Sequence, residues 1–261
     1  ADGSWQDANN WANTSGGTGG TCDPDNDGTA DFPGSGDDAQ VESNIFVQST
    51  TTVGSLTQAG TSDFLVLNGA NLTIEGDFTI KSGGQTSTFS TSNNIILGSG
   101  VLDVGGNLTV ENNGKLNVRK KSGSVGKLRL AGNFTNNGTF NDITPGEPGT
   151  VAFYGGGSQS VSGTASFTGG SAIDILQVEG AGTEVTFNPD LEITEASSVE
   201  SGTELIVNGS LDANTGTTGG SIGGAGAIGG SGEITALTVA SGSDITIASG
   251  SSLKVPGDLD V

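Results

Sequence analysis

A nine-residue pattern recurs along the chain and constrains its fold more than any other feature. Each copy has apolar residues at alternate positions, then a glycine and a small polar residue, then a second alternating run. Four copies match throughout, at residues 72–80, 102–110, 205–213 and 253–261. Residues 128–136 end on a polar residue, and residues 185–193 have Pro189 in place of the glycine. Alternation with period two predicts strands with one buried face, and glycine followed by Asp, Asn or Ser predicts a tight bend between them.

Stacking of successive copies explains how such short strands cover their apolar faces. Two strands alone cannot do so, but coils stacked on coils can, which predicts an all-β fold of the β-solenoid type. We expect a right-handed parallel β-helix with almost no helix, because no convincing amphipathic helical periodicity occurs. The pattern glycines at 76, 106, 132, 209 and 257 are unequally spaced, which predicts insertions between coils. A β-sandwich of short strands is the alternative, and the recurring strand–glycine–strand unit favours the solenoid.

Two stretches depart from the pattern. Residues 1–40 lack alternation and predict an irregular N-terminal cap with a long loop, so that residues 41–261 form the solenoid. The glycine-rich stretch 215–234 predicts either a flexible loop or coils with very small side chains. Ile222 and Ile228 favour the coils.

Composition excludes several kinds of chemistry. The 261 residues contain no His and one Cys, and 8 Lys and Arg stand against 29 Asp and Glu, for a net charge of −21. Without His there is no Ser-His-Asp triad and no imidazole metal site. With Cys22 alone there is no internal disulfide or Cys-ligated cluster. The negative charge disfavours nucleic acid and anionic lipid as partners, and no apolar run is long enough to span a bilayer.

The chain opens without Met and without a signal-like apolar segment, so it is interpreted as a mature or trimmed product. An acidic composition rich in Gly, Ser, Thr and Asn is typical of a secreted bacterial protein. We therefore expect an extracellular, cell-surface location.

The acidic run at residues 23–31 predicts a calcium site. Its first six residues satisfy the D-x-[DN]-x-[DN]-G pattern of a calcium loop. The expected ligands are the carboxylates at alternate positions and one backbone carbonyl, supplied by Asp23, Asp25, Asp27, Thr29 and Asp31. The twelfth position, where a bidentate Glu is usual, is Gly34, and Asp37 or Asp38 is its expected substitute. The run also resembles thrombospondin type-3-like calcium repeats. The alternative is a solvated acidic turn.

The opening of the chain resembles a family of large bacterial surface β-helix proteins. The resemblance rests on the Gly3-Ser-Trp5…Asn-Trp11 segment followed by Pro33…Asp37-Asp38…Val41. Residues 149–163 are similar to rungs of Bacteroidetes-type secreted, adhesin-like proteins. This resemblance covers nearly the whole chain. It implies an extracellular structural or adhesive role, with export by type IX secretion or autotransport, although no sorting domain or barrel is present in the chain.

Two further groups of residues are candidate contact sites. Trp5 and Trp11 are expected to plug the N-terminal end of the solenoid, with stacking on sugar rings as the alternative. Six of the eight basic residues form a candidate patch for an acidic polysaccharide or a neighbouring subunit, or else a solvated loop and its flanks; they are Lys115, Arg119, Lys120, Lys121, Lys127 and Arg129.

The leading functional prediction is a structural protein that assembles with copies of itself, head to tail, into a fibre, sheath or adhesin stalk. A solenoid end exposes unpaired strands and a cross-section of the core. The expected junction therefore joins the last repeat, through Leu253, Val255, Leu259 and Val261, to the N-terminal segment with Trp5 and Trp11.

A carbohydrate-binding or carbohydrate-active solenoid is the alternative function. No pair of carboxylates beside an aromatic platform supports catalysis, so we predict that the protein is not an enzyme. Thr86-Ser-Thr88 is isolated and does not predict an ice-binding surface.

Overall fold

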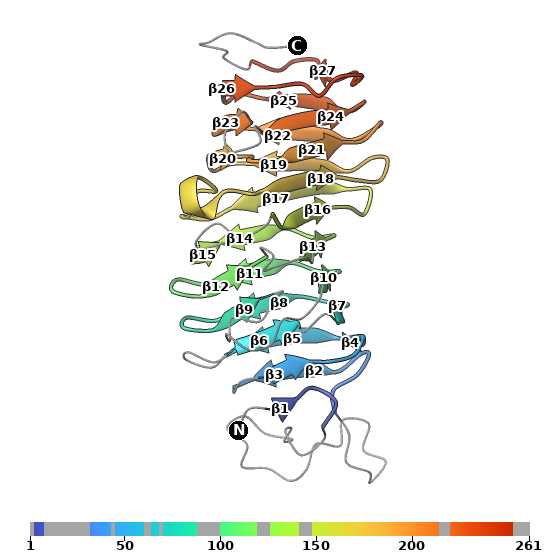
Figure 1. Ribbon diagram of the computed structural model, residues 1–261, viewed down its shortest axis with the longest axis vertical. Helices are drawn as coiled ribbons and strands as arrows, with labels where there is room; N and C mark the ends of the chain where they lie inside the picture. Colours follow the sequence, from blue (N-terminus) through green and yellow to red (C-terminus); the bar gives the residue numbers. More distant parts are fainter. Residues whose placement is uncertain are drawn as a thin grey trace.

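The computed structural model describes residues 3–7, 32–42, 45–59, 64–67, 70–87, 100–118, 126–140, 148–213 and 220–252. It confirms the predicted all-β solenoid, because every pairing between the described strands is parallel. Figure 1 shows the strands stacked across the long axis of a rod, with β1 near one end and β27 near the other. The right-handed sense of the coil stays a prediction.

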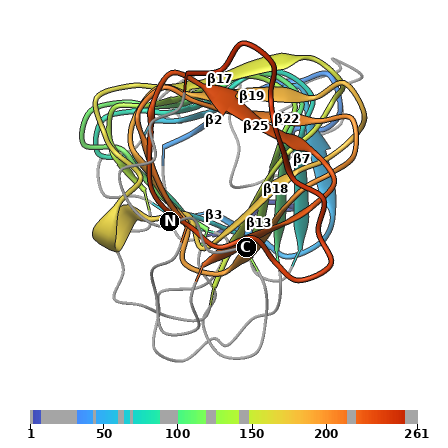
Figure 2. The same cartoon turned by 90° about the horizontal axis from the view of Figure 1, so that it is seen from above.

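The coil has three faces, which the chain visits in a fixed order (Figure 2). Face A begins as a six-stranded sheet of β1 (Gly3–Ser4), β3 (Ile45–Val47), β6 (Phe64–Leu67), β9 (Gln85–Ser87), β12 (Lys115–Asn117) and β15 (Thr139–Phe140). It continues as the three strands β20 (Leu191–Glu192), β23 (Ser210–Ala213) and β26 (Glu233–Leu237). Phe167 joins the two parts. It forms a parallel β-bridge with Leu191, and its ring centroid lies 5.4 Å from that of Phe140.

Faces B and C are longer sheets. Face B has eight strands: β4 (Thr51–Val53), β7 (Asn71–Ile74), β10 (Val101–Val104), β13 (Lys127–Leu130), β16 (Thr150–Phe153), β18 (Ile175–Val178), β21 (Ala196–Val199) and β24 (Ser221–Gly224). Face C has ten: β2 (Asp38–Val41), β5 (Ser55–Gln58), β8 (Phe78–Ile80), β11 (Leu108–Val110), β14 (Phe134–Asn136), β17 (Ser158–Ser162), β19 (Glu184–Phe187), β22 (Glu204–Val207), β25 (Ala227–Gly230) and β27 (Thr246–Ile247). The only helix in the described ranges is a 3-10 turn, η2 (Gly169–Ser171).

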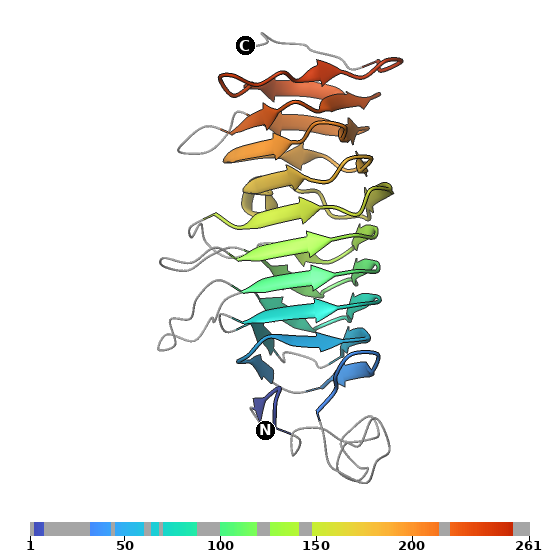
Figure 3. The ribbon, with the colours of Figure 1, turned by 90° about the vertical axis from the view of Figure 1, so that its right-hand side faces the viewer.

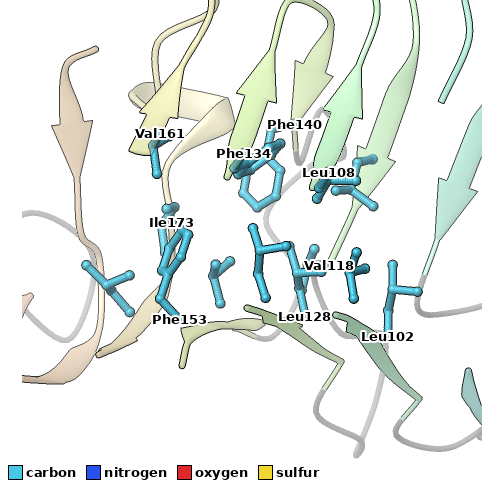
Figure 4. Close-up of a cluster of buried hydrophobic side chains, with 14 of the residues drawn as sticks. Leu102, Leu108, Val118, Leu128, Phe134, Phe140, Phe153, Val161 and Ile173 are labelled. Atoms are coloured by element: carbon cyan, nitrogen blue, oxygen red, sulfur yellow. The ribbon is translucent and has the colours of Figure 1, made fainter. Parts of the chain in front are cut away.

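One apolar core runs along the inside of the rod. Alternate residues of the strands point inward and stack on their counterparts in the next coil, as Leu72, Leu102 and Leu128 do on face B. In the middle of the rod the core is aromatic (Figure 4). There the rings of Phe134 and Phe140 meet edge to face, with 6.1 Å between their centroids. Such contacts add stability beyond the burial of apolar area.

Glycine is required where faces B and C meet. Gly76, Gly106 and Gly132 stack one above the other in successive coils. A Cβ atom on Gly132 would lie 2.2 Å from the carbonyl oxygen of Gly106, closer than any real contact. The recurring glycine therefore allows neighbouring coils to approach at this corner, as well as allowing the chain to bend.

The nine-residue pattern lies at two different corners of the coil. In its copies before residue 140 the glycine joins face B to face C, but Pro189 and Gly209 join face C to face A. The pattern therefore moves by one side of the coil between β14 and β19. This change, together with insertions, explains the unequal spacing of the glycines.

Three successive coils have long connections at the corner from face A to face B. They comprise residues 88–100, 118–126 and 141–149, whereas β20 and β21 are joined by residues 193–195. Figure 3 shows the same stack of coils from a second side.

The glycine-rich stretch forms coils, as Ile222 and Ile228 indicated. Strands β24 and β25 bury both isoleucines completely. Residues 214–219 lie outside the described part.

Candidate functional site

A cluster of polar side chains covers the outside of face B over β10, β13, β16 and β18. It begins with Asp103 of β10 and Arg129 of β13, which occupy paired positions in the sheet. Arg129 Nη1 donates to Asp103 Oδ2 over 2.5 Å. Tyr154, which directly follows β16, donates its hydroxyl to Asp103 Oδ1 over 2.6 Å. The Arg129 guanidinium lies 4.1 Å from the centre of the Tyr154 ring, so the three side chains form one closed unit.

A second contact in this cluster spans a whole coil. Lys127 Nζ on β13 donates to Gln177 Oε1 over 2.9 Å and to Glu179 Oε1 over 3.1 Å. Strand β16 lies between β13 and β18 in the sheet. The side chain of Lys127 therefore reaches across one strand to bind the next.

Two residues of β16 make this reach possible. Ala152 pairs with Arg129 on one side and with Gln177 on the other, and its small side chain leaves room above the sheet. Thr150 and Ala152 alternate with the inward-facing Val151 and Phe153, yet both are buried. The longer polar side chains of the neighbouring strands therefore cover the outward-facing residues of β16. We name Asp103, Lys127, Arg129, Tyr154, Gln177 and Glu179 the face-B clamp.

Tyr154 is electrostatically perturbed by its place in the clamp. Burial is the largest cause, and the hydrogen bond to Asp103 and the charge of Asp103 add to it. Arg129 acts in the opposite direction, and the net effect raises the pKa of Tyr154 to about 12. The phenol is therefore neutral at any ordinary pH and donates a hydrogen bond to the Asp103 carboxylate.

The clamp is suited to holding coils together. Two cations and two carboxylates balance each other within it, and its ion pairs are about one quarter exposed. Partly exposed pairs are individually worth under about 1 kcal/mol. Here the clamp connects four successive coils on the outside of the rod, opposite the aromatic core on the inside.

The predicted basic patch is divided in the structure. Lys127 and Arg129 belong to the clamp, and each already binds a carboxylate. Lys115 lies on β12, on face A. Arg119, Lys120 and Lys121 lie outside the described residues, so their part in the patch stays a prediction.

Trp5 lies at the N-terminal end of the core and is fully buried. Its indole nitrogen donates to the carbonyl oxygen of Pro33 over 3.1 Å, which ties two separate segments of residues 1–40 together. Gln6 binds the Thr51 hydroxyl over 2.8 Å, and Ser35 binds Glu75 over 2.9 Å. These contacts fasten the segment to the first coils, and β1 and β2 pair with faces A and C.

The other predicted site residues fall outside the described part of the chain. These are the calcium-loop residues Asp23, Asp25, Asp27, Thr29 and Asp31, then Trp11, and the junction residues Leu253, Val255, Leu259 and Val261. Within the described ranges, no three carboxylate or thiol side chains form a group that could hold a metal ion. The calcium loop therefore stays a prediction.

Sequence reasoning did not identify the clamp, although part of it can be read from the repeat. Aligned copies of the pattern place Asp103 and Arg129 at the same position in successive coils, where opposite charges attract. The contact from Lys127 to Glu179 skips a coil, and Tyr154 lies in a corner that lacks the pattern. No alignment of copies would have paired these residues.

One further pair of carboxylates lies outside the clamp, on face C. Glu184 and Glu204 are paired positions on β19 and β22. Burial, and then the charge of Glu184, raise the pKa of Glu204. Like charges at paired positions of a sheet are destabilising.

Together these features define a parallel β-solenoid whose outer faces carry polar networks. Comparison with known proteins finds no matching family model, no matching curated protein and no matching solved structure. Across the described ranges, no helix is long and apolar enough to cross a membrane.

Proposed function

We propose that the protein is an extracellular structural protein, a rod that serves as the subunit of a cell-surface fibre or as the stalk of an adhesin. The observation that carries this proposal is the single core, which extends from Trp5 to Leu237. A rod built this way resists bending, because each coil is held to the next along three faces.

The outer surface supports the same proposal. The charged groups of the face-B clamp bind each other on the outside of the sheet. Such an arrangement supports cohesion better than catalysis, and the proposal includes no enzymatic activity.

Location and partners are inferred from the sequence. The net charge of −21 favours solubility of a large exposed surface and disfavours nucleic acid. The proposed partner is a second copy of the chain, with calcium bound in the run at residues 23–31. Membrane insertion is not part of the proposal.

Negative-stain imaging of the full chain tests the proposal. Purified protein with calcium and physiological salt should form straight, unbranched fibres one rod wide. Particles that remain single short rods at every protein and salt concentration would contradict assembly.

A carbohydrate-binding role is the second candidate, because Tyr154, Arg129 and Gln177 lie on the outside of the rod. The same coils carry long connections from face A to face B, and insertions in repeat proteins often mark a binding face. A glycan array should then show binding that Tyr154→Ala removes and Gln40→Ala, on face C, does not. Equal binding by both variants would count against this role.

A further inference from the structure

The outside of face C carries two parallel ranks of polar side chains. The first rank consists of outward residues at paired positions of β5, β8, β11, β14 and β17, namely Thr57, Thr79, Thr109, Thr135 and Ser162. The second rank lies two residues earlier in each coil and consists of Ser55, Asp77, Asn107, Asn133 and Ser160. We name the two ranks together the face-C array.

Hydrogen bonds between coils fix the second rank. Asp77 Oδ1 accepts hydrogen bonds from the backbone and side-chain nitrogens of Asn107, over 2.7 and 3.1 Å. Asn107 Oδ1 accepts from the backbone nitrogen of Asn133 over 3.0 Å. Asn133 Oδ1 in turn accepts from the backbone nitrogen and the hydroxyl of Ser160, over 2.8 and 3.1 Å. The side chains therefore hold their relative positions before any partner binds, which lowers the entropic cost of binding.

The first rank leaves its hydroxyl groups available. Among the described residues, no group binds the side-chain hydroxyl of Thr57, Thr79 or Thr109, and Thr135 Oγ1 lies 3.4 Å from Ser162 Oγ. These side chains are half-buried between their neighbours, so each presents its hydroxyl and methyl groups outward.

Short connections border the array on both sides. Strands β8, β11 and β14 are preceded by residues 75–77, 105–107 and 131–133, and followed by residues 81–84, 111–114 and 137–138. Asp77, Asn107 and Asn133 are exposed. The long connections lie at the corner from face A to face B, away from this face (Figure 2). The middle of the array is therefore open to a broad, rigid partner.

The array is almost uncharged. Asp77 is its single charged residue, although the whole chain carries a net charge of −21. An ionic partner would be better served by the acidic surface elsewhere, so the charge of the array fits a neutral partner. The partner must also be repetitive, because one hydroxyl contributes little alone and many equal contacts must form together.

We propose that the face-C array binds the surface of ice crystals, as a further function of the rod. Neighbouring strands place equivalent threonines about 4.8 Å apart, close to the distance at which water molecules repeat along one axis of the ice lattice. The hydroxyl groups bond to water of the lattice, and the methyl groups exclude mobile water. This function does not depend on assembly of the rods into fibres.

The sequence does not show the array at once, because its members belong to separate coils. The Thr86-Ser-Thr88 segment is isolated, whereas Thr79, Thr109 and Thr135 become neighbours only through strand pairing. Their unequal separation in sequence comes from the connections between faces A and B, which do not disturb the register on face C.

Nanolitre osmometry of the full chain tests this proposal. The wild type should shape a seed crystal and hold its freezing temperature below its melting temperature. Thr109→Tyr places a large ring at the middle of the array, and should reduce the gap between the two temperatures about tenfold or more, as loss of a central contact does. Thr52→Tyr makes the same change at an outward position of β4 on face B and should leave the gap unchanged. Circular dichroism should show that both variants keep the β signal.

The outcomes are distinct from those of the fibre experiment. Rounded crystals and equal freezing and melting temperatures with the wild type would overturn ice binding and leave the fibre function standing. Equal gaps for Thr109→Tyr and Thr52→Tyr would overturn the assignment to face C. Retention of the protein by a crystalline polysaccharide, without any effect on ice, would also overturn the proposal, since it would identify a different solid as the partner.

Discussion

Replacing Gly132 with alanine tests the stacked-glycine corner, the feature that most directly connects the repeat to the fold. The added Cβ would lie 2.2 and 2.5 Å from the carbonyl oxygen and carbon of Gly106, and 2.9 Å from the nitrogen of Asn107. All three atoms belong to the backbone of the coil below, so no side-chain rotation relieves the clash. Separating them to an ordinary contact requires a movement of roughly 1 Å.

The movement would strain hydrogen bonds between the coils. Gly106 N donates to the carbonyl oxygen of Gly76 over 2.9 Å, and Leu108 N donates to that of Asn133 over 2.8 Å. Overpacking typically costs about 1–3 kcal/mol, and a backbone clash belongs at the upper end of that range. For a chain of this size, about 3 kcal/mol lowers the melting temperature by roughly 6–12 °C.

Gly157→Ala is the matched control. This glycine lies at the same corner in the next coil, and an added Cβ would meet nothing within 4 Å. Its melting temperature, followed by circular dichroism, should change by no more than a surface substitution allows, about 0.5 kcal/mol. Equal melting temperatures for Gly132→Ala, Gly157→Ala and the wild type would refute the reasoning that close backbone approach selects glycine here.

Three further predictions address the clamp, the calcium loop and the acidic pair. Tyr154 is the single tyrosine, so ultraviolet titration reports its ionisation alone. The titration midpoint should lie near 12 in the wild type and fall toward 10 in Asp103→Asn. A midpoint near 10 in the wild type would exclude the hydrogen bond from Tyr154 to Asp103. Because folding raises the pKa of Tyr154, the protonated phenol stabilises the folded state fully below pH 10, and this stabilisation is lost as pH rises toward 12. A calcium chelator should lower the melting temperature, and Asp25→Ala with Asp27→Ala should remove that response; identical curves with and without chelator would contradict calcium binding. Burial and Glu184 raise the pKa of Glu204, which destabilises the fold at neutral pH, so Glu204→Gln should raise the melting temperature at pH 7 and lose this advantage below about pH 4; a lower melting temperature at pH 7 would show that the carboxylate is stabilising.

The repeat predicted the fold class because its two signals have local causes. Alternation places Leu72 and Ile74 on one side of a strand whatever lies around them, and both are fully buried. The glycine-rich coils were also predictable from Ile222 and Ile228, since an apolar residue between glycines still has a core to enter. These features depend on a few adjacent residues.

The position of the pattern around the coil has no local signature. Gly106 and Gly209 look alike in sequence, yet one joins face B to face C and the other joins face C to face A. The corner is decided by which strand of the previous coil each strand pairs with, and that depends on every intervening insertion. For the same reason the contact from Lys127 to Glu179 could not be predicted from the repeat.

Diffraction from aligned fibres of the full chain tests the central claim most directly. In the proposed structural rod, the strands lie across the long axis, and copies join end to end along that axis. A meridional reflection at about 4.8 Å, the spacing between neighbouring strands, is therefore expected along the fibre axis. Absence of fibres, or fibres whose 4.8 Å reflection lies on the equator, would contradict a rod that assembles end to end.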